Sequence, residues 1–124
     1  MADLISFGEG FRHPAPARWG CTHLEATPIL AEPLMVEHHY APGGEMHEHT
    51  AGEAILCVCI GGSGFVKVGS DTSELHAHQA IVWPAGLTHK LWTTDSSLTV
   101  LLLHFPGRET LAPAEWRTPA PEEA

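Results

Sequence analysis

Three side chains with metal-binding chemistry lie close together in the segment "HEHTAGE": His47, His49 and Glu53. Residues two apart on an extended chain point to the same face, so His47 and His49 share one side. The Glu53 side chain faces the same side as these histidines if the turn at residues 50–52 places the next strand beside them. Imidazole nitrogen and carboxylate oxygen suit Zn²⁺, Fe²⁺, Mn²⁺, Ni²⁺ or Cu²⁺.

A fourth candidate ligand is His89, in the segment "WPAGLTHKLW". Pro84 restricts φ and Gly86 permits a positive φ, so this turn reverses the chain and delivers His89 at the start of a strand. We therefore predict that one divalent transition metal is held by His47, His49, Glu53 and His89. Positions left open on the metal would take water or a substrate.

The competing explanation is that these histidines are solvated loop residues of a His-rich chain. Ten histidines in 124 positions give about 0.8 His-x-His pairs by chance, which is the false-positive risk of so short a motif. Two pairs occur, and the spacing alone therefore proves nothing. For the second pair, His76 and His78, we expect an ordinary solvated strand end.

Several further residues are candidates for the surroundings of the metal. His38 and His39 are neighbours on a strand, so only one of them lines a cavity, and His39 is assigned to it. His104, in "TVLLLHF", is either a candidate catalytic residue near the metal or a core histidine. Met46 faces away from the ligands on strict alternation. The predicted pocket residues are His39, Tyr40, Trp83, Trp92 and His104, with core packing or a dimer contact as the alternative for the aromatic ones.

The elements that must position these residues are short strands. From Leu34 onward, β-type runs such as "LMVEHHY", "AILCVCI", "FVKV", "QAIVW" and "SLTVLLLHF" alternate with Gly, Pro and Ser clusters. This pattern is typical of an all-β sandwich or barrel. The predicted organisation is an N-terminal arm at 1–19, with "CTHLEATPIL" after it as an edge strand, one barrel domain at 20–108, and a Pro/Ala/Glu-rich tail at 109–124.

The composition excludes several classes of function. The net charge of −9 and the six scattered basic residues disfavour nucleic acid as a partner. No apolar stretch is long enough to span a membrane, and no signal peptide is recognisable, so a cytoplasmic protein is expected. Three cysteines, with Cys57 and Cys59 two apart on one strand, favour a reduced compartment in which they are small buried hydrophobes rather than thiolate ligands.

Two of these segments together resemble the paired motifs of the cupin superfamily. "PGGEMHEHTAGE" is similar to the first motif, a Gly-led turn followed by His-x-His and Glu, and "WPAGLTHKLW" is similar to the second, Pro-x-Gly-x-x-His. "GGSGFVKV" looks like the turn and strand that join them, so the resemblance runs from about residue 36 to 105. It implies a double-stranded β-helix, a jelly-roll barrel of two antiparallel sheets that holds the metal inside, and association as a homodimer.

One departure from the family pattern bears on Glu53. The usual gap from the Glu to the closing Gly is six residues, whereas Gly61 leaves seven and Gly62 leaves eight. If Gly62 is the equivalent residue, strand parity is preserved. If Gly61 is, a bulge is needed and Glu53 is displaced from the metal. His78, where the family usually has Gly, is a second departure.

The resemblance implies two classes of function. The first is a mononuclear metal-dependent enzyme acting on a small organic substrate, with a dioxygenase favoured over an isomerase, lyase or decarboxylase. The second is a metal- or small-molecule-binding sensor module without catalysis. A barrel that binds a small molecule without metal is the third reading, which the presence of all four ligand residues disfavours.

Overall fold

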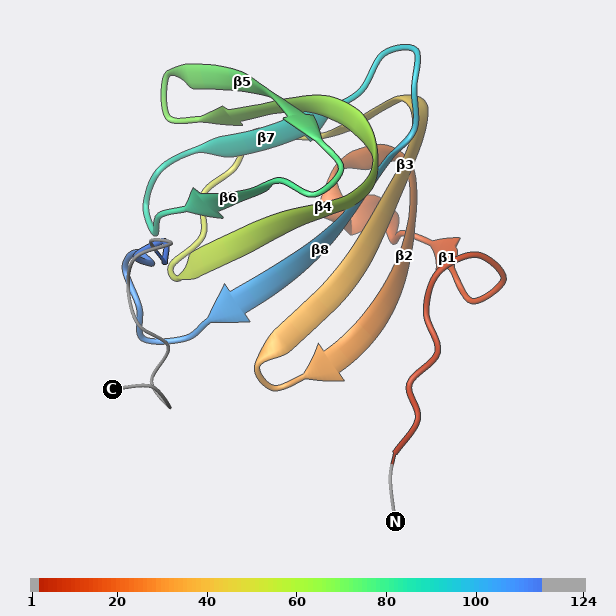
Figure 1. Cartoon of the computed structure of the whole chain (residues 1–124), viewed down its shortest axis with the longest axis horizontal. Coiled ribbons are helices and arrows are strands. Elements are labelled where there is room, and N and C mark those ends of the chain that lie inside the picture. Colours follow the sequence, from red (N-terminus) through yellow and green to blue (C-terminus); the bar gives the residue numbers. More distant parts are fainter. Residues whose placement is uncertain (1–2, 115–124) are drawn as a thin grey trace.

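The structure is a computed structural model that describes residues 3–114. The regular secondary structure of these residues consists of strands and one short 3-10 turn (Figure 1). All strand pairs are antiparallel. The elements are β1 (His13–Pro14), η1 (Ala17–Trp19), β2 (Cys21–Ala31), β3 (Leu34–Met46), β4 (Ala54–Val68), β5 (Asp71–His76), β6 (Ala80–Trp83), β7 (His89–Trp92) and β8 (Leu98–Phe105). The all-β prediction is confirmed.

Two long strands, β3 and β4, each contribute to both sheets of the barrel. The first part of β4 pairs with β8 and β6, and its second part pairs with β5 and β7. β3 likewise pairs with β8 along residues 35–40 and with β7 at Glu45. The ring β3, β8, β4, β7 thereby closes, and Figure 1 shows β4 curving from one sheet into the other. The predicted jelly-roll barrel is confirmed.

Apolar side chains at alternate positions of the strands fill the interior. In β4, the buried Ile55, Cys57 and Cys59 alternate with more exposed neighbours, as expected for a strand with one face toward a core. Burial raises the pKa of the Cys57 and Cys59 thiols, so both are protonated apolar groups near neutral pH. All three cysteines are free.

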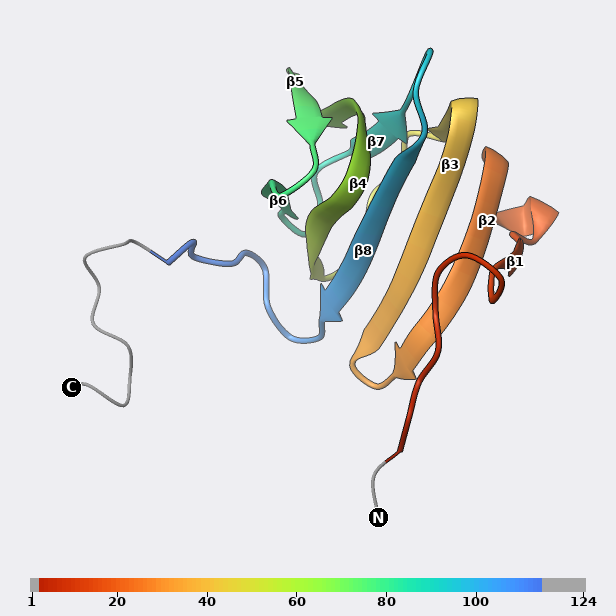
Figure 2. The ribbon, with the colours of Figure 1, turned by 45° about the vertical axis from the view of Figure 1, so that its right-hand side comes forward.

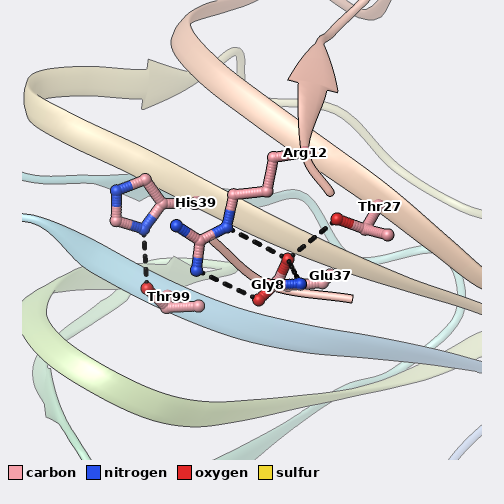
Figure 3. A network of polar contacts seen from close by, with 6 residues as sticks. All are labelled: Gly8, Arg12, Thr27, Glu37, His39 and Thr99. Carbon is pink, nitrogen blue, oxygen red and sulfur yellow. Dashed lines mark hydrogen bonds and ion pairs between the residues drawn. The ribbon is translucent and has the colours of Figure 1, made fainter. Parts of the chain in front are cut away.

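The N-terminal arm is bonded to the outside of the barrel. β1 pairs with β2, and Figure 2 shows the preceding segment running alongside β2 and β3. The anchor is Glu37 of β3, whose side chain is only 1% exposed. Its carboxylate accepts hydrogen bonds from the Gly8 N–H, the Arg12 guanidinium and the Thr27 hydroxyl (Figure 3). One outward-facing carboxylate therefore holds two segments of the chain together.

The segment after β8 returns to the barrel. The Ala54 N–H donates to the Arg108 carbonyl, and the Ala85 N–H donates to the Glu109 carbonyl. The remainder of the predicted tail, residues 115–124, lies outside the described residues. Within 3–114 there is no helix with the length and apolar character needed to cross a membrane.

Candidate functional site

A cavity of about 330 Å³ opens within the barrel, and four imidazoles line it: His38, His49, His89 and His104. The remaining lining is mostly apolar. It includes Trp19 of η1, Met46 of β3, Ile55 of β4, Trp83 of β6 and Leu102 of β8. An apolar cavity with a few polar groups is the usual form of a small-molecule site.

His49 and His89 are joined through both backbone and side chains. The His89 N–H donates to the His49 carbonyl at 2.8 Å, and the His49 N–H donates to the His89 carbonyl at 3.1 Å. Their Nε2 atoms lie 3.1 Å apart. The loop after β3 is thus pinned to the start of β7, where the Pro-x-Gly turn delivers His89 as predicted.

The environment of His89 favours a neutral ring. His89 is 1% exposed and stacks on Trp83, with ring centroids 4.2 Å apart and an interplanar angle of 13°. Burial, reinforced by the nearby His49, lowers the pKa of His89 from its ordinary 6.5 to about 4. Its Nδ1 is buried and, within residues 3–114, has no hydrogen bond of normal geometry. A neutral imidazole is the form that binds a metal.

The tautomer of His49 follows from its hydrogen bond. Its Nδ1 lies 2.7 Å from the His47 carbonyl oxygen, which can only accept, so Nδ1 carries the proton. Nε2 is then left with its lone pair directed at His89 Nε2, with which it makes a hydrogen bond. A ring N–H held by a backbone carbonyl is the usual outer-shell partner of a metal-binding histidine.

The spacing of the two Nε2 atoms fits a shared metal ion. Two nitrogens bound at 2.0–2.1 Å, with an angle between 90° and 109°, are about 2.8 to 3.4 Å apart. The observed 3.1 Å lies within that interval. Across residues 3–114, however, no three His, Cys, Asp or Glu side chains are close enough together to hold a metal ion. The structure therefore brings together two of the four predicted ligands.

His47 lies at the edge of this pair. It is exposed and follows Met46, the last residue of β3, which points into the cavity with the even-numbered residues of that strand. The His47 ring packs on Gly20, where an added Cβ would lie 2.7 Å from its Cδ2 atom. Met46, not His47, shares the cavity wall with His49, because the chain leaves the strand after Met46 and strict alternation ends there.

Glu53 pairs with His104 instead of with the other predicted ligands. Its Oε2 atom lies 3.2 Å from His104 Nδ1, at the cavity wall. The β4–β8 register shifts between Cys59 and Gly61, which is the bulge expected if Gly61 closes the first motif. Gly62 follows with φ +70, and an added Cβ there would lie 1.9 Å from the Ser97 carbonyl oxygen.

Strand parity explains which predicted pocket residues line the cavity. Trp83 and His104 line it. His38 takes the place predicted for His39, because Val36 and His38 face inward while His39 points outward, with its Nδ1 2.7 Å from Thr99 Oγ1 (Figure 3).

Two further predicted pocket residues also lie outside the cavity wall. Tyr40 is fully buried behind it, with its hydroxyl 3.1 Å from His38 Nδ1. Trp92 shares the less buried face of β7 with Lys90, opposite His89 and Leu91, and stacks on Phe65 at 5.5 Å.

The sequence reasoning missed His38, Met46 and Trp19 as cavity residues. For His38 the signal was present, since it shares its parity with Val36 and Tyr40 in an apolar run. For Trp19 there was none, because nothing in "HPAPARWG" indicates that η1 packs against the barrel opening. The second pair, His76 and His78, is exposed as expected, and His78 has φ +75, the left-handed conformation that glycine adopts most easily.

Comparisons with known proteins point to one fold. No family model matches the chain, and no curated protein matches it either. Solved structures do. A predicted oxalate decarboxylase from Thermotoga maritima matches with a TM-score of 0.74 and 16% identity, over 83% of this chain and 98% of its own.

Two more structures agree with it. An RmlC-like cupin from Shewanella frigidimarina has a TM-score of 0.69 and 17% identity, over 87% of this chain and 95% of its own. KdgF from Halomonas sp. has a TM-score of 0.67 and 13% identity, over 86% of this chain and 97% of its own. At these identities the likeness shows the fold, and the chain has the cupin fold.

Proposed function

We propose that this cupin barrel binds one divalent transition metal through Nε2 of His49 and Nε2 of His89, and a small organic ligand in the cavity beside it. The observation that carries the proposal is the 3.1 Å separation of these two atoms, together with the carbonyl that keeps the proton of His49 on Nδ1. Remaining positions on the metal are for His47 and Glu53, once their side chains turn toward it, and for the ligand.

The chemistry we propose is that of a metal-dependent enzyme, in the first instance a dioxygenase, acting on a small organic substrate. A divalent metal at this place supplies a Lewis acid that polarises a carbonyl or enolate oxygen. The chain itself supplies the walls: Trp83 stacks behind His89, and Trp19 and Met46 line the cavity. His104, whose Nδ1 faces Glu53, is the group placed to hold a proton beside the ligand.

Metal analysis of the purified protein tests the first part of this proposal. We expect close to one equivalent of Fe, Mn, Zn, Ni or Cu per chain, removable by a chelator and restored by adding the metal back. Protein that neither carries nor takes up any of these metals would refute it.

Oxygen uptake tests the second part. The metal-loaded protein is offered diketones, flavonols and thiols, and consumption of O₂ with any of them supports the dioxygenase. A loaded protein that binds such compounds without turnover acts as a binding or sensor module instead.

A further inference from the structure

His38 is a cavity residue that the proposed metal site does not use. It comes from β3, is 7% exposed, and lines the same cavity as His49 and His89. Its ring is held from two directions. Trp19 stacks on it at 5.6 Å with an interplanar angle of 13°, and the Tyr40 hydroxyl lies 3.1 Å from its Nδ1.

The partners of Tyr40 determine which ring nitrogen of His38 carries the proton. The second neighbour of the Tyr40 hydroxyl is the Cys21 sulfur, at 4.0 Å, and the Cys21 thiol donates to the Trp19 carbonyl. Sulfur is a weak acceptor, so His38 Nδ1 is the better acceptor within reach of the tyrosine O–H. When Tyr40 donates to Nδ1, the single ring proton of a neutral His38 is on Nε2.

Burial keeps both groups in these protonation states. It raises the pKa of Tyr40 well above the ordinary value for a phenol, so the hydroxyl remains a donor. Burial, with the nearby His104 as the next cause, lowers the pKa of His38 from its ordinary 6.5 to about 4, so the ring is neutral near pH 7. Nε2 makes no hydrogen bond with any residue in 3–114, and the ring faces the cavity.

We propose that His38 is the ligand-recognising residue of the cavity, presenting Nε2–H to the carbonyl oxygen of an otherwise apolar ligand. This inference rests on the proposed function, because it assumes that the cavity takes a small organic molecule. No Lys or Arg within residues 3–114 lines the cavity, which favours a neutral carbonyl over an anion. The wall also buries the indole N–H of Trp83 without a partner in that part of the chain, so a second donor is present for an oxygen acceptor.

Two probes of matched shape test the proposal: acetophenone, which has a carbonyl, and ethylbenzene, which has a methylene in its place. Binding of each to the protein as purified is followed by calorimetry or by shifts in the methyl spectrum. We expect acetophenone to bind about threefold to tenfold more tightly, the usual net effect of one neutral hydrogen bond.

Neighbouring histidines provide the matched variants. In His38→Phe the preference for acetophenone falls below about twofold, whereas in His39→Phe, where the ring lies on the outer face, it is unchanged. No preference in the unmodified protein, or a preference that survives in His38→Phe, overturns the proposal.

A second measurement does not depend on how well His38→Phe folds. Ring nitrogen spectra of the ¹⁵N-labelled protein report the tautomer of His38 directly, and we expect the proton on Nε2. Tyr40→Phe should convert this into a mixture of tautomers and reduce the preference for acetophenone. A proton found on Nδ1 of the unmodified protein would overturn the proposal.

Metal content separates this proposal from the proposed metal site. His38→Phe should retain its metal, because His38 is not a proposed ligand. Protein that discriminates between the two probes but holds no metal refutes the metal site alone. Protein that holds the metal but does not discriminate refutes the role of His38 alone.

Discussion

The Nε2 atoms of His49 and His89 lie 3.1 Å apart although the residues are 40 positions apart in the sequence. Two backbone hydrogen bonds between the same residues fix this approach. The pair is therefore set by the fold, and the proposed metal ion would find two nitrogen donors already in place.

The first prediction concerns how much His49 and His89 contribute to metal affinity. His49→Ala and His89→Ala should each weaken Zn²⁺ binding by more than about 100-fold, because even outer-shell partners of metal ligands cost about 10- to 100-fold. Competition with a chelating dye measures this, and His76→Ala, at an exposed position, is the control. Variants that bind Zn²⁺ as tightly as the parent would place the metal elsewhere.

The same assay identifies the remaining ligands. His47→Ala and Glu53→Gln should each lower the affinity by about tenfold or more if these side chains turn toward the metal. If Glu53 only positions His104, Glu53→Gln leaves Zn²⁺ affinity unchanged and His104→Ala does so as well.

The second prediction concerns pH. The pKa of His38 is about 4 in the folded protein, because of burial and of the facing His104 and His49, with Glu37 acting in the opposite direction. The unfolded chain takes up this proton near pH 6.5. Protonation of His38 therefore does not lower the free energy of unfolding above pH 6.5. As the pH falls from 6.5 toward 4, the free energy of unfolding decreases by up to about 3 kcal/mol.

Urea unfolding of metal-free protein between pH 4 and 7.5 measures this slope. His38→Gln should flatten it in part, since the pKa of His89 is lowered in the same direction. His76→Gln, at an exposed position, should leave it unchanged. An identical slope in His38→Gln would show that another group carries the pH dependence.

The third prediction concerns the bond between the arm and the barrel. Burial raises the pKa of Glu37, but hydrogen bonds from Arg12 and Thr27 and the charge of Arg12 outweigh it, so the carboxylate is ionised. Arg12→Met leaves this buried charge without its cation and should cost about 3 kcal/mol in the free energy of unfolding. Arg18→Met, at an exposed position of η1, should cost less than about 0.5 kcal/mol.

A double variant tests the coupling. Arg12→Met combined with Glu37→Gln should cost less than the sum of the two single changes, because the unpaired charge is then removed. Additive costs would mean that the two side chains do not interact in solution.

The fourth prediction concerns Gly62. It has φ +70, and an added Cβ would lie 1.9 Å from the Ser97 carbonyl oxygen. Gly62→Ala should cost about 4 kcal/mol or prevent folding, because backbone strain and a steric clash combine. Gly69 has φ +60 and open space around it, so Gly69→Ala should cost only about 1 to 2 kcal/mol. Equal costs at the two positions would rule out the clash.

Strand patterning was sufficient to predict most of the fold. The run "LMVEHHY" lies in β3, "SLTVLLLHF" covers β8 and the residue before it, and "CTHLEATPIL" lies in β2. "AILCVCI" and "FVKV" were expected as separate strands, but both belong to β4. The intervening "GGSG" does not end the strand, because the bulge at Cys59–Gly61 and the left-handed Gly62 bend it into the second sheet instead.

The candidate site was less accessible to sequence reasoning. The approach of His49 and His89 follows from the two motifs, since each places its histidine beside a turn at the same end of the barrel. The positions of His47 and Glu53 depend on where alternation stops after Met46 and on a one-residue bulge in β4. Such local irregularities leave no distinct signal in residue type.

The passage of β4 through both sheets limits how this chain can diverge. A one-residue insertion within β4 that is not absorbed by a bulge would reverse the facing of every later residue in the strand, and so exchange interior for exterior in two walls at once. Length changes should be tolerated instead at hairpin tips such as Gly69 and Ser70, which lie beyond the last paired residue. Among natural variants of this chain, insertions and deletions should therefore accumulate at such tips, while β4 retains its length.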